Sequence, residues 1–421
     1  MNKTAPVVAH ETAFRMIRTT NVRHGRIDLS ECRYVEEDTY EKWTRRASLQ
    51  PGDVILTREA PIGEVGMVKE AEGVFLGQRL MQYRANPKLL DSRFLLYTFL
   101  SPALQHQFRS HEGSGSVVSH IRVGDCFKFK LSLPPIGAQR EIASTLGALD
   151  DRITLLRETN ATLEAIAQAL FKSWFVDFDP VRAKMAGRAP ESMDEATAAL
   201  FPDALEESEL GPVPKGWSVM PVGNAIDTVG GATPDTKNEA FWDPPLHCWT
   251  SPKDLSGASA PVLLNTERRI SDLGLNRISS GLLPAGSLLM SSRAPIGYLA
   301  IAQVPVAINQ GYIGLLPGGK LSPLFMLFWC RNNMDAIKGR ANGSTFMEIS
   351  KKAFRPIPAL VPAPELLERF DKVVGVLFAR LVENVRQATS LAEVRDTLLP
   401  RLISGQLRLP EAQSQLEEAL A

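Results

Sequence analysis

The sequence lacks a long apolar run, a close pair of cysteines and an excess of either charge. No stretch of about 18 apolar residues occurs, which excludes a transmembrane helix, and the first residues lead into no apolar segment that would predict a secretory signal. The cysteines lie too far apart for a zinc site or a disulfide framework: Cys32, Cys126, Cys248 and Cys330. We therefore expect a cytoplasmic protein, and its 421 residues suggest roughly two to four domains.

Sequence signals for a catalytic centre are absent or incomplete. There is no Gly-x-x-x-x-Gly-Lys-Ser/Thr loop, so we expect no ATP binding by this chain. Asp243-Pro244-Pro245-Leu246 is similar to the Asp-Pro-Pro-aromatic motif of amino-methyltransferases, but the aromatic residue and a preceding Gly-rich loop are missing, which favours a plain loop. His106, His111 and His120 lack partners at metal-ligand spacing, so we expect no metal site and interpret them as solvated or core residues.

Charge is distributed unevenly along the chain, although 47 basic residues balance 47 acidic ones overall. Residues 1–135 carry a net charge of +4 and residues 213–362 a net charge of +5, whereas residues 136–212 carry −7 and residues 363–421 carry −2. A polyanion would be attracted to the first and third segments. Because the excess is small, we expect a partner protein to contribute to any tight binding of DNA.

The chain contains an internal repeat. Ala60-Pro61-Ile62-Gly63 recurs as Ala294-Pro295-Ile296-Gly297, and Pro51–Leu56 matches Ala285–Met290 at the same offset. An offset of 228 relates three further pairs: Gly115–Ile121 with Gly343–Ile349, Pro134 with Pro362, and Gly147 with Gly375. Each copy begins with short β-branched or aliphatic runs broken by Gly and Pro, which predicts a strand-rich domain.

The second part of each copy has the spacing of a long amphipathic helix. Apolar residues recur at threes, fours and sevens from Ile142 to Leu170 and again from Leu366 to Leu398, close to a heptad. Two such helices bury their apolar faces most economically by pairing as a coiled coil, although each could instead pack on its own strand-rich domain. Pro180 is expected to end the first helix, and residues 181–212 are interpreted as a linker with some local helix.

Glycines at equivalent helix positions need a separate explanation. Gly147 and Gly375 each cost about 1 kcal/mol relative to alanine within a helix. A close crossing of the two helices would explain them. A tolerated glycine or a break between two shorter helices would explain them equally well.

The order of these segments resembles the specificity (S) subunit of type I restriction-modification systems, over almost the whole chain. The residues that carry the resemblance are Pro51–Arg58 with Ile62-Gly63, Leu131–Pro135 with Gln139–Ile142, Leu170–Phe178, Gly211–Trp217 and Leu398–Gly405. Each motif is weak alone, but their order and duplication make the similarity specific. One departure is that Trp217–Ala240, which opens the second copy, has no equivalent in the first, because Phe14–Val22 already aligns near His247–Leu255. The first domain is therefore expected to be short at its N-terminal side.

The resemblance implies an α+β fold with two target-recognition domains separated by two long antiparallel helices, related by an internal pseudo-twofold repeat. It implies that each recognition domain reads one half of a bipartite DNA site and that the helices set the gap between the halves. It also implies docking of methyltransferase (M) and restriction (R) subunits, which would hold S-adenosylmethionine, ATP and Mg while this chain holds no cofactor and no catalytic residue. The expected segments are recognition domain 1 (1–135), spacer helix 1 (136–180), a linker (181–212), recognition domain 2 (213–362), and spacer helix 2 with a tail (363–421).

Candidate DNA-binding residues are polar side chains on Gly-bounded loops, because Arg suits guanine, Asn or Gln suit adenine, and Ser or Thr suit either. In the first copy these are Arg58, Gln78, Arg79, Ser114, Ser116, Ser119 and Arg122. In the second copy they are Lys253, Arg293, Asn309, Gln310, Ser344, Thr345, Lys351 and Lys352. Candidates for partner docking are Trp174, Phe175, Phe178 and Leu402. For the three aromatic residues, at a helix end, core packing or docking is favoured over stacking on bases. The rival functions are a DNA methyltransferase or nuclease in its own right, and a coiled-coil scaffold that does not bind DNA.

Overall fold

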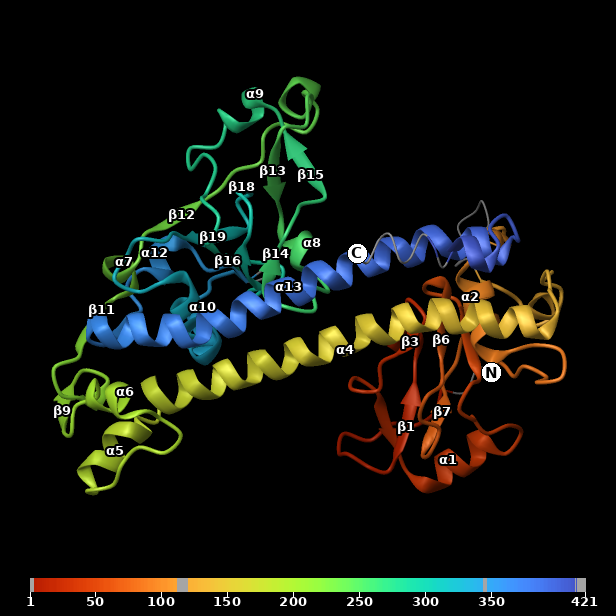
Figure 1. Ribbon diagram of the computed structural model, residues 1–421, viewed down its shortest axis with the longest axis horizontal. Helices are drawn as coiled ribbons and strands as arrows, with labels where there is room; N and C mark the ends of the chain where they lie inside the picture. The colour runs from red at the N-terminus through yellow and green to blue at the C-terminus, as the bar shows by residue number, and fades with distance from the viewer. Residues whose placement is uncertain (1–3, 112–119, 344–346, 413, 415–421) are drawn as a thin grey trace. The chain divides into compact units, whose positions relative to one another are not determined.

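The computed structural model describes residues 4–111, 120–343, 347–412 and 414, which form two compact units (Figure 1). Unit 1 comprises residues 1–153 and 389–421, and unit 2 comprises residues 154–388. Each unit holds one of the two strand-rich copies and one part of each long helix. Among the described residues, no helix is long and apolar enough to cross a membrane.

The first copy, in unit 1, consists of short strands and helices. Its strands are β1 (Phe14–Ile17), β2 (Val22–Arg23), β3 (Arg26–Ile27), β4 (Arg33–Val35), β5 (Val54–Arg58), β6 (Ile62–Met67), β7 (Val74–Leu76) and β8 (Leu80–Tyr83). Its helices are α1 (Glu37–Thr44), α2 (Ser92–Leu100) and α3 (Pro102–Arg109), with short 3-10 helices η1 (Thr19–Asn21) and η2 (Asp125–Phe127). β1 lies between antiparallel β4 and parallel β7, and β5 lies between β6 and β8, both antiparallel.

The second copy, in unit 2, has more strands. They are β9 (Leu205–Ser208), β10 (Gly211–Pro214), β11 (Ser218–Pro221), β12 (Thr228–Gly230), β13 (His247–Thr250), β14 (Val262–Leu263), β15 (Arg268–Ile270), β16 (Leu288–Ser291), β17 (Leu299–Ala302), β18 (Val306–Ile308), β19 (Tyr312–Leu315) and β20 (Pro358–Val361). The short helices are α5 (Asp179–Met185), α6 (Glu195–Ala199), α7 (Val222–Ala225), η3 (Glu239–Phe241), α8 (Pro252–Leu255), α9 (Asp272–Leu275), α10 (Pro323–Asn332), α11 (Met334–Gly339) and α12 (Lys351–Phe354).

The two copies share one pattern of strand pairing, which confirms the predicted duplication. β13 lies between antiparallel β15 and parallel β18, as β1 lies between β4 and β7. β16 lies between antiparallel β17 and β19, as β5 lies between β6 and β8. The central strands β5 and β16 are continuous apolar runs, and Val54–Leu56 and Leu288–Met290 have no exposed surface. Such runs form strands that are covered on both faces, so the same sequence pattern produces the same place in the fold twice.

The second copy contains a strand–helix–strand segment that the described part of the first copy lacks. β11 pairs with β20, and β12 pairs with the outer edge of β19. In the first copy, residues 130–133 correspond to β20 but are not a strand, and β8 pairs with β5 alone among the described residues. The difference expected from the unmatched Trp217–Ala240 is therefore present in the structure.

The two long helices are α4 (Ile136–Phe175) and α13 (Pro364–Ile403) (Figure 1). Side chains of the two helices bond to each other in each unit. In unit 1, Asp150 of α4 bonds to Arg395 of α13. In unit 2, Asn160 meets Asn384 while Phe171 meets Phe370, so the helices run antiparallel. The predicted pairing is confirmed. The alternative holds in part, since α13 also packs on its own strand-rich copy through one large core, and the end of α4 joins the same core.

The boundary between α4 and the following segment differs from the prediction. α4 ends at Phe175 rather than at Pro180, and Phe178 has a left-handed backbone with φ of 58°. Pro180 instead occupies the first turn of α5, where its missing N–H costs no hydrogen bond. The segment predicted as a linker is folded into unit 2, since Val181 and Phe201 are buried in the same core as the helices.

The equivalent glycines of the helices have different surroundings. A Cβ on Gly147 would lie 2.6 Å from the guanidinium of Arg93, whereas a Cβ on Gly375 would meet nothing within 4 Å. Neither position marks a helix break, because both lie inside continuous helices. At Gly147 the close neighbour is an arginine side chain from α2 rather than the other long helix, so of the two explanations a close helix crossing does not apply there.

Candidate nucleic-acid interface

In the first copy, the predicted arginines gather at one end of the β6–β5–β8 sheet. The backbone N–H of Arg58, the last residue of β5, donates to the carbonyl of Arg79 at 2.8 Å. The N–H of Ile121 donates to the carbonyl of Arg58 at 2.9 Å, which places Arg122 beside them. We call Arg58–Pro61, Gln78–Arg79 and Ile121–Arg122 the loop end of the first copy.

The side chains at this loop end have different roles. Arg58 is partly buried and its Nη1 donates to the carbonyl of Ile121 at 3.0 Å, so this guanidinium holds the protein's own backbone. Arg79 is about half exposed, with 52% of its side chain accessible, and forms an ion pair with Glu59 at 3.0 Å. Arg122 is exposed and Gln78 is partly exposed. Arg79 and Arg122 are therefore the cations best placed to meet an external phosphate or base.

The second copy has an equivalent loop end, formed by Ser292–Pro295, Asn309–Gly311 and Ile349–Lys351. Ser292 N–H donates to the Gly311 carbonyl at 2.8 Å and Ile349 N–H donates to the Ser292 carbonyl at 3.0 Å. These are the counterparts of the bonds made by Arg58 and Ile121. The same backbone frame therefore presents different side chains in the two copies.

The predicted residues of the second copy lie on or beside this frame. Arg293 forms an ion pair with Glu348 at 3.6 Å, and the exposed Gln310 accepts a hydrogen bond from Thr233 at 2.5 Å. Asn309 accepts a hydrogen bond from the N–H of Gly311, and its own N–H donates to the carbonyl of Thr250, close to Lys253.

Three lysines complete this set. Lys253 is exposed and bonds to Glu267 at 2.8 Å. Lys351 and Lys352 are exposed in the first turn of α12, and the aliphatic end of Lys351 lies against Gly230, where a Cβ would come within 3.1 Å. The loop end thus combines amide and cationic groups, the chemistry that contacts base edges and phosphates.

Sequence reasoning missed one segment of the first copy. Gly77 N–H donates to the Ile17 carbonyl at 2.8 Å, as Asn309 N–H donates to the Thr250 carbonyl at 3.0 Å in the second copy. Arg18 and Thr19, which follow β1, therefore correspond to the residues that precede Lys253, and Thr19 donates to the carbonyl of Ala60 at 3.1 Å. The signal was present, because Phe14–Val22 already aligned with His247–Leu255.

Five predicted residues lie outside the described residues. They are Ser114, Ser116, Ser119, Ser344 and Thr345.

The residues predicted for partner docking are part of the chain's own core. Trp174, Phe175 and Phe178 are between 5% and 9% exposed and pack with Phe201, Trp217 and Phe370 in unit 2. Leu402 is 2% exposed in unit 1. The docking assignment is corrected to core packing, because side chains covered this fully present no surface to a partner. Sequence alone could not separate the two roles, since both place large apolar residues on one helix face.

Reactive chemistry is sparse in the part of the chain that the structure describes. No group of three or more His, Cys, Asp or Glu side chains is arranged to hold a metal ion there. All four cysteines are buried, and burial raises the pKa of the Cys32 thiol to about 11 and raises the pKa of Cys330 as well, which disfavours the nucleophilic thiolate.

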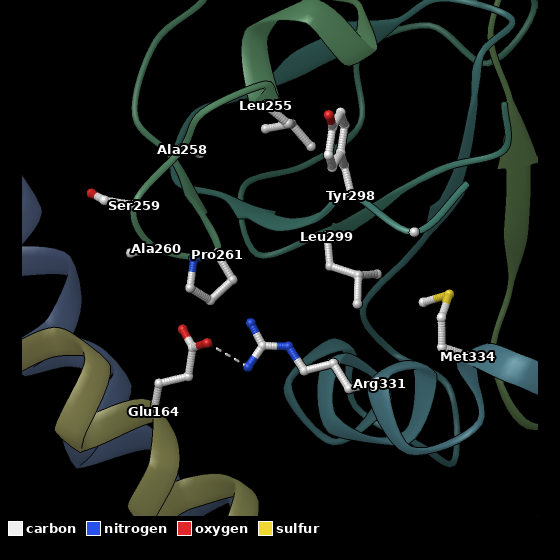
Figure 2. Close-up of a pocket in the computed structure, with 11 residues that line it drawn as sticks. Glu164, Leu255, Ala258, Ser259, Ala260, Pro261, Tyr298, Leu299, Arg331 and Met334 are labelled. Carbon is white, nitrogen blue, oxygen red and sulfur yellow. Dashed lines mark ion pairs between the residues drawn. The ribbon is translucent and has the colours of Figure 1, made fainter. Parts of the chain in front are cut away.

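A cavity of about 350 Å³ lies in unit 2 between α4 and the second copy (Figure 2). Figure 2 shows Glu164 of α4 and Arg331 of α10 paired at its base, at 2.7 Å, below Pro261, Leu299 and Tyr298. The pair is about one-quarter exposed on each side. Its opposite charges neutralise each other and join the recognition copy to the helix, so we assign the pair a structural role.

Comparison with known proteins identifies the family. The family described as type I restriction modification DNA specificity domain matches residues 37–165 and 214–372. The chain is 26% identical over 406 residues to the type I restriction enzyme HindI specificity subunit of Haemophilus influenzae, covering 86% of this chain and 88% of that protein. It is 32% identical over 191 residues to the MjaIX specificity subunit of Methanocaldococcus jannaschii, covering 45% of this chain and 44% of that one.

Solved structures give weaker similarity. The S subunit of a type I restriction-modification system from M. genitalium is 16% identical with a TM-score of 0.47, over 93% of this chain and 92% of that chain. The HsdS subunit from Thermoanaerobacter tengcongensis is 18% identical with a TM-score of 0.34, over 94% and 91%. Each family match covers most of one structural copy and the first part of the long helix that follows it, and together the matches cover more than half of the sequence. The chain therefore belongs to the type I restriction modification DNA specificity family.

Proposed function

We propose that this non-catalytic specificity subunit reads a bipartite DNA site with its two loop ends, one half-site for each copy. The observation that carries the proposal is the duplicated backbone frame: Arg58, Arg79 and Ile121 in the first copy are bonded as Ser292, Gly311 and Ile349 are in the second. Two domains that recognise different half-sites require the same backbone arrangement with different side chains. Phosphate contacts would set the position of each domain, and contacts to base edges would carry the sequence.

Individual roles follow from side-chain chemistry. Arg79 and Arg293 are candidates for guanine, since a guanidinium can donate twice to one guanine edge. Asn309 and Gln310 are candidates for adenine, and Lys253, Lys351 and Lys352 for phosphates. The ion pairs that now hold Arg79 and Arg293, with Glu59 and Glu348, would be exchanged for DNA contacts on binding.

We also propose that methylation and cleavage are performed by M and R subunits that assemble on this chain. Those subunits would hold S-adenosylmethionine, ATP and Mg. The small positive excess of each copy supports this division, because few phosphate contacts give weak DNA binding that a partner must supplement. The rival of a methyltransferase or nuclease in its own right, and that of a scaffold without DNA contacts, are not favoured by any feature of the described residues.

The test is site-specific methylation by the complex of this chain with its M subunit. Without the chain, methylation of the defined site should be lost. Arg79→Ala should weaken recognition at one position of one half-site by about 1–3 kcal/mol and leave the other half-site unchanged. The matched control is Lys88→Ala, an exposed lysine after the opposite end of β8, which should leave the sequence preference unchanged.

Two results would contradict the proposal. Equal site-specific methylation without this chain would show that another subunit reads the sequence. Transfer of a labelled methyl group or crosslinking of cofactor to the isolated chain would favour the methyltransferase rival.

A further inference from the structure

Within unit 2, the described part of each long helix has one buried polar side chain in its apolar seam, Asn160 on α4 and Asn384 on α13. On α4 the buried Ile153, Leu156 and Asn160 and the partly buried Leu163 recur at intervals of three and four, and only Asn160 is polar. On α13 the sequence Leu381, Asn384 and Leu391 has the same rhythm. Asn160 is 3% exposed and Asn384 is 1% exposed, so both amides lie inside the helix pair.

The two interruptions meet. Asn384 Nδ2 donates to Asn160 Oδ1 at 2.9 Å, and Asn160 Nδ2 donates to the carbonyl of Leu381 at 3.2 Å. All three residues belong to unit 2. Around them lie Leu163, Val382 and Val385, together with Val262 of the second copy. Both of these amide hydrogen bonds go to the other helix.

This buried amide pair contributes little to the stability of the fold. Asn384 Oδ1 is buried with no hydrogen-bond partner, and a buried polar atom of this kind costs free energy. Two leucines in these positions would remove that cost. Buried asparagines in coiled coils exchange stability for a defined register, because any slip leaves the amides against apolar side chains. A slip of one heptad would place Asn160 beside apolar seam residues and separate it from Asn384.

We propose that the Asn160–Asn384 pair fixes the axial register of α13 against α4 in unit 2, and thereby the half-site spacing that the complex accepts. The second part rests on the proposed function, and the first part does not. The pair thus acts as a positioning element for recognition without touching DNA.

Cysteine trapping measures the register directly, without DNA. Leu163 lies three residues after Asn160, and Leu381 lies three residues before Asn384. Both belong to one apolar cluster, so they face each other in the antiparallel pair. Leu163→Cys with Leu381→Cys should form a disulfide in the native register, whereas Leu163→Cys with Ala388→Cys should form one only after a heptad slip. The full chain should give the first crosslink alone. The Asn160→Leu/Asn384→Leu variant should give both, and should melt at a higher temperature.

The matched control adds two leucines to exposed positions of the same helices, Thr162→Leu with Arg386→Leu, and should keep the native crosslink alone. A single Asn384→Leu change should lower the melting temperature, since it leaves Asn160 buried with one partner fewer. If Asn160→Leu/Asn384→Leu still gives only the Leu163–Leu381 crosslink, the asparagines do not set the register.

Methylation of DNA sites with different spacers tests the functional part. With both half-sequences constant, the complex with the unaltered chain should prefer one spacer length. The double leucine variant should lose about tenfold of that preference, the factor that ~1.4 kcal/mol of register preference produces. An unchanged spacer preference together with a shifted crosslink would overturn the link to spacing. If the unaltered complex shows no sequence preference at all, the proposed function fails, and the crosslinks still decide the register.

Discussion

The hydroxyl of Tyr97 donates to Asp150 Oδ2 at 2.7 Å, and this bond connects the first recognition copy to the helical spacer within unit 1. The other carboxylate oxygen of Asp150 accepts from Arg395 Nη1 at 2.6 Å. Tyr97 lies on α2, Asp150 on α4 and Arg395 on α13, so one carboxylate joins three elements. Tyr97 is 1% exposed, so the side chain that carries this hydroxyl is buried.

Replacement of this carboxylate should destabilise unit 1. Asp150→Ala leaves the Tyr97 hydroxyl buried without its acceptor and removes one of the two ion pairs of Arg395, which keeps its pair with Asp396. The two losses together should cost about 1–3 kcal/mol. Thermal melting of the full chain would measure the change. The neighbouring Asp151→Ala breaks only an exposed ion pair with Arg93, for which less than about 1 kcal/mol is expected. Equal losses for the two variants would contradict the role of Asp150.

Protonation of the Asp53 carboxylate at low pH should destabilise the first copy. Burial acts to raise the pKa of this carboxyl, but hydrogen bonds from Arg84, Gln50 and Gln82 outweigh it and hold the pKa below its usual value. A group whose pKa is lowered by folding contributes stability above its unfolded pKa of about 3.9 and loses it as the pH falls through the lower folded value.

Melting temperature measured from neutral pH downwards would test this. The first copy should lose stability below about pH 4. Asp53→Asn should already be less stable at neutral pH and should show a smaller further loss in acid. The second copy has Ser287 at the equivalent position, so Ser287→Ala should leave the acid dependence unchanged. If Asp53→Asn loses as much melting temperature in acid as the unaltered chain does, other carboxylates cause the acid sensitivity.

Trp174 should act as a core residue. Its ring packs on Phe201 and Phe370 with centroids 5.3 Å and 6.0 Å away, so Trp174→Ala should cost the isolated chain about 3–5 kcal/mol. Melting of the chain without partners is the measurement. Ile166→Ala, at a position of α4 that is 45% exposed, should change stability little. Unchanged stability of Trp174→Ala with lost assembly would restore the docking assignment.

The helices should act as a ruler for the DNA site. Insertion of one turn after Leu155, matched by one turn after Ala388 so that the seam stays paired, adds about 5.4 Å to each helix. At about 3.4 Å per base pair, the preferred spacer should lengthen by roughly one or two base pairs while both half-sequences stay the same. Sequencing of methylated adenines would show this. An unchanged spacer would mean that the helices do not set the gap.

Much of the architecture was readable from the sequence because it depends on periodicity and repetition. The apolar spacing of residues 139–170 and 366–398 predicted both long helices, and the duplicated Ala-Pro-Ile-Gly motif located equivalent strand ends in both copies. Side-chain direction repeats every 3.6 residues in a helix and every two in a strand, so burial leaves a local trace in the sequence.

Other features were decided only by tertiary structure. Trp174 could have faced a partner or the core, and only the folded unit shows which surface covers it. The sequence left two explanations open for Gly147, and the structure shows that it makes room for Arg93 from α2. Asn160 and Asn384 were not singled out in the sequence, and only the fold shows the bond between these residues, which are 224 positions apart. Local sequence determines which face of each element is buried, while partners across such separations are fixed by packing between elements, which no local pattern records.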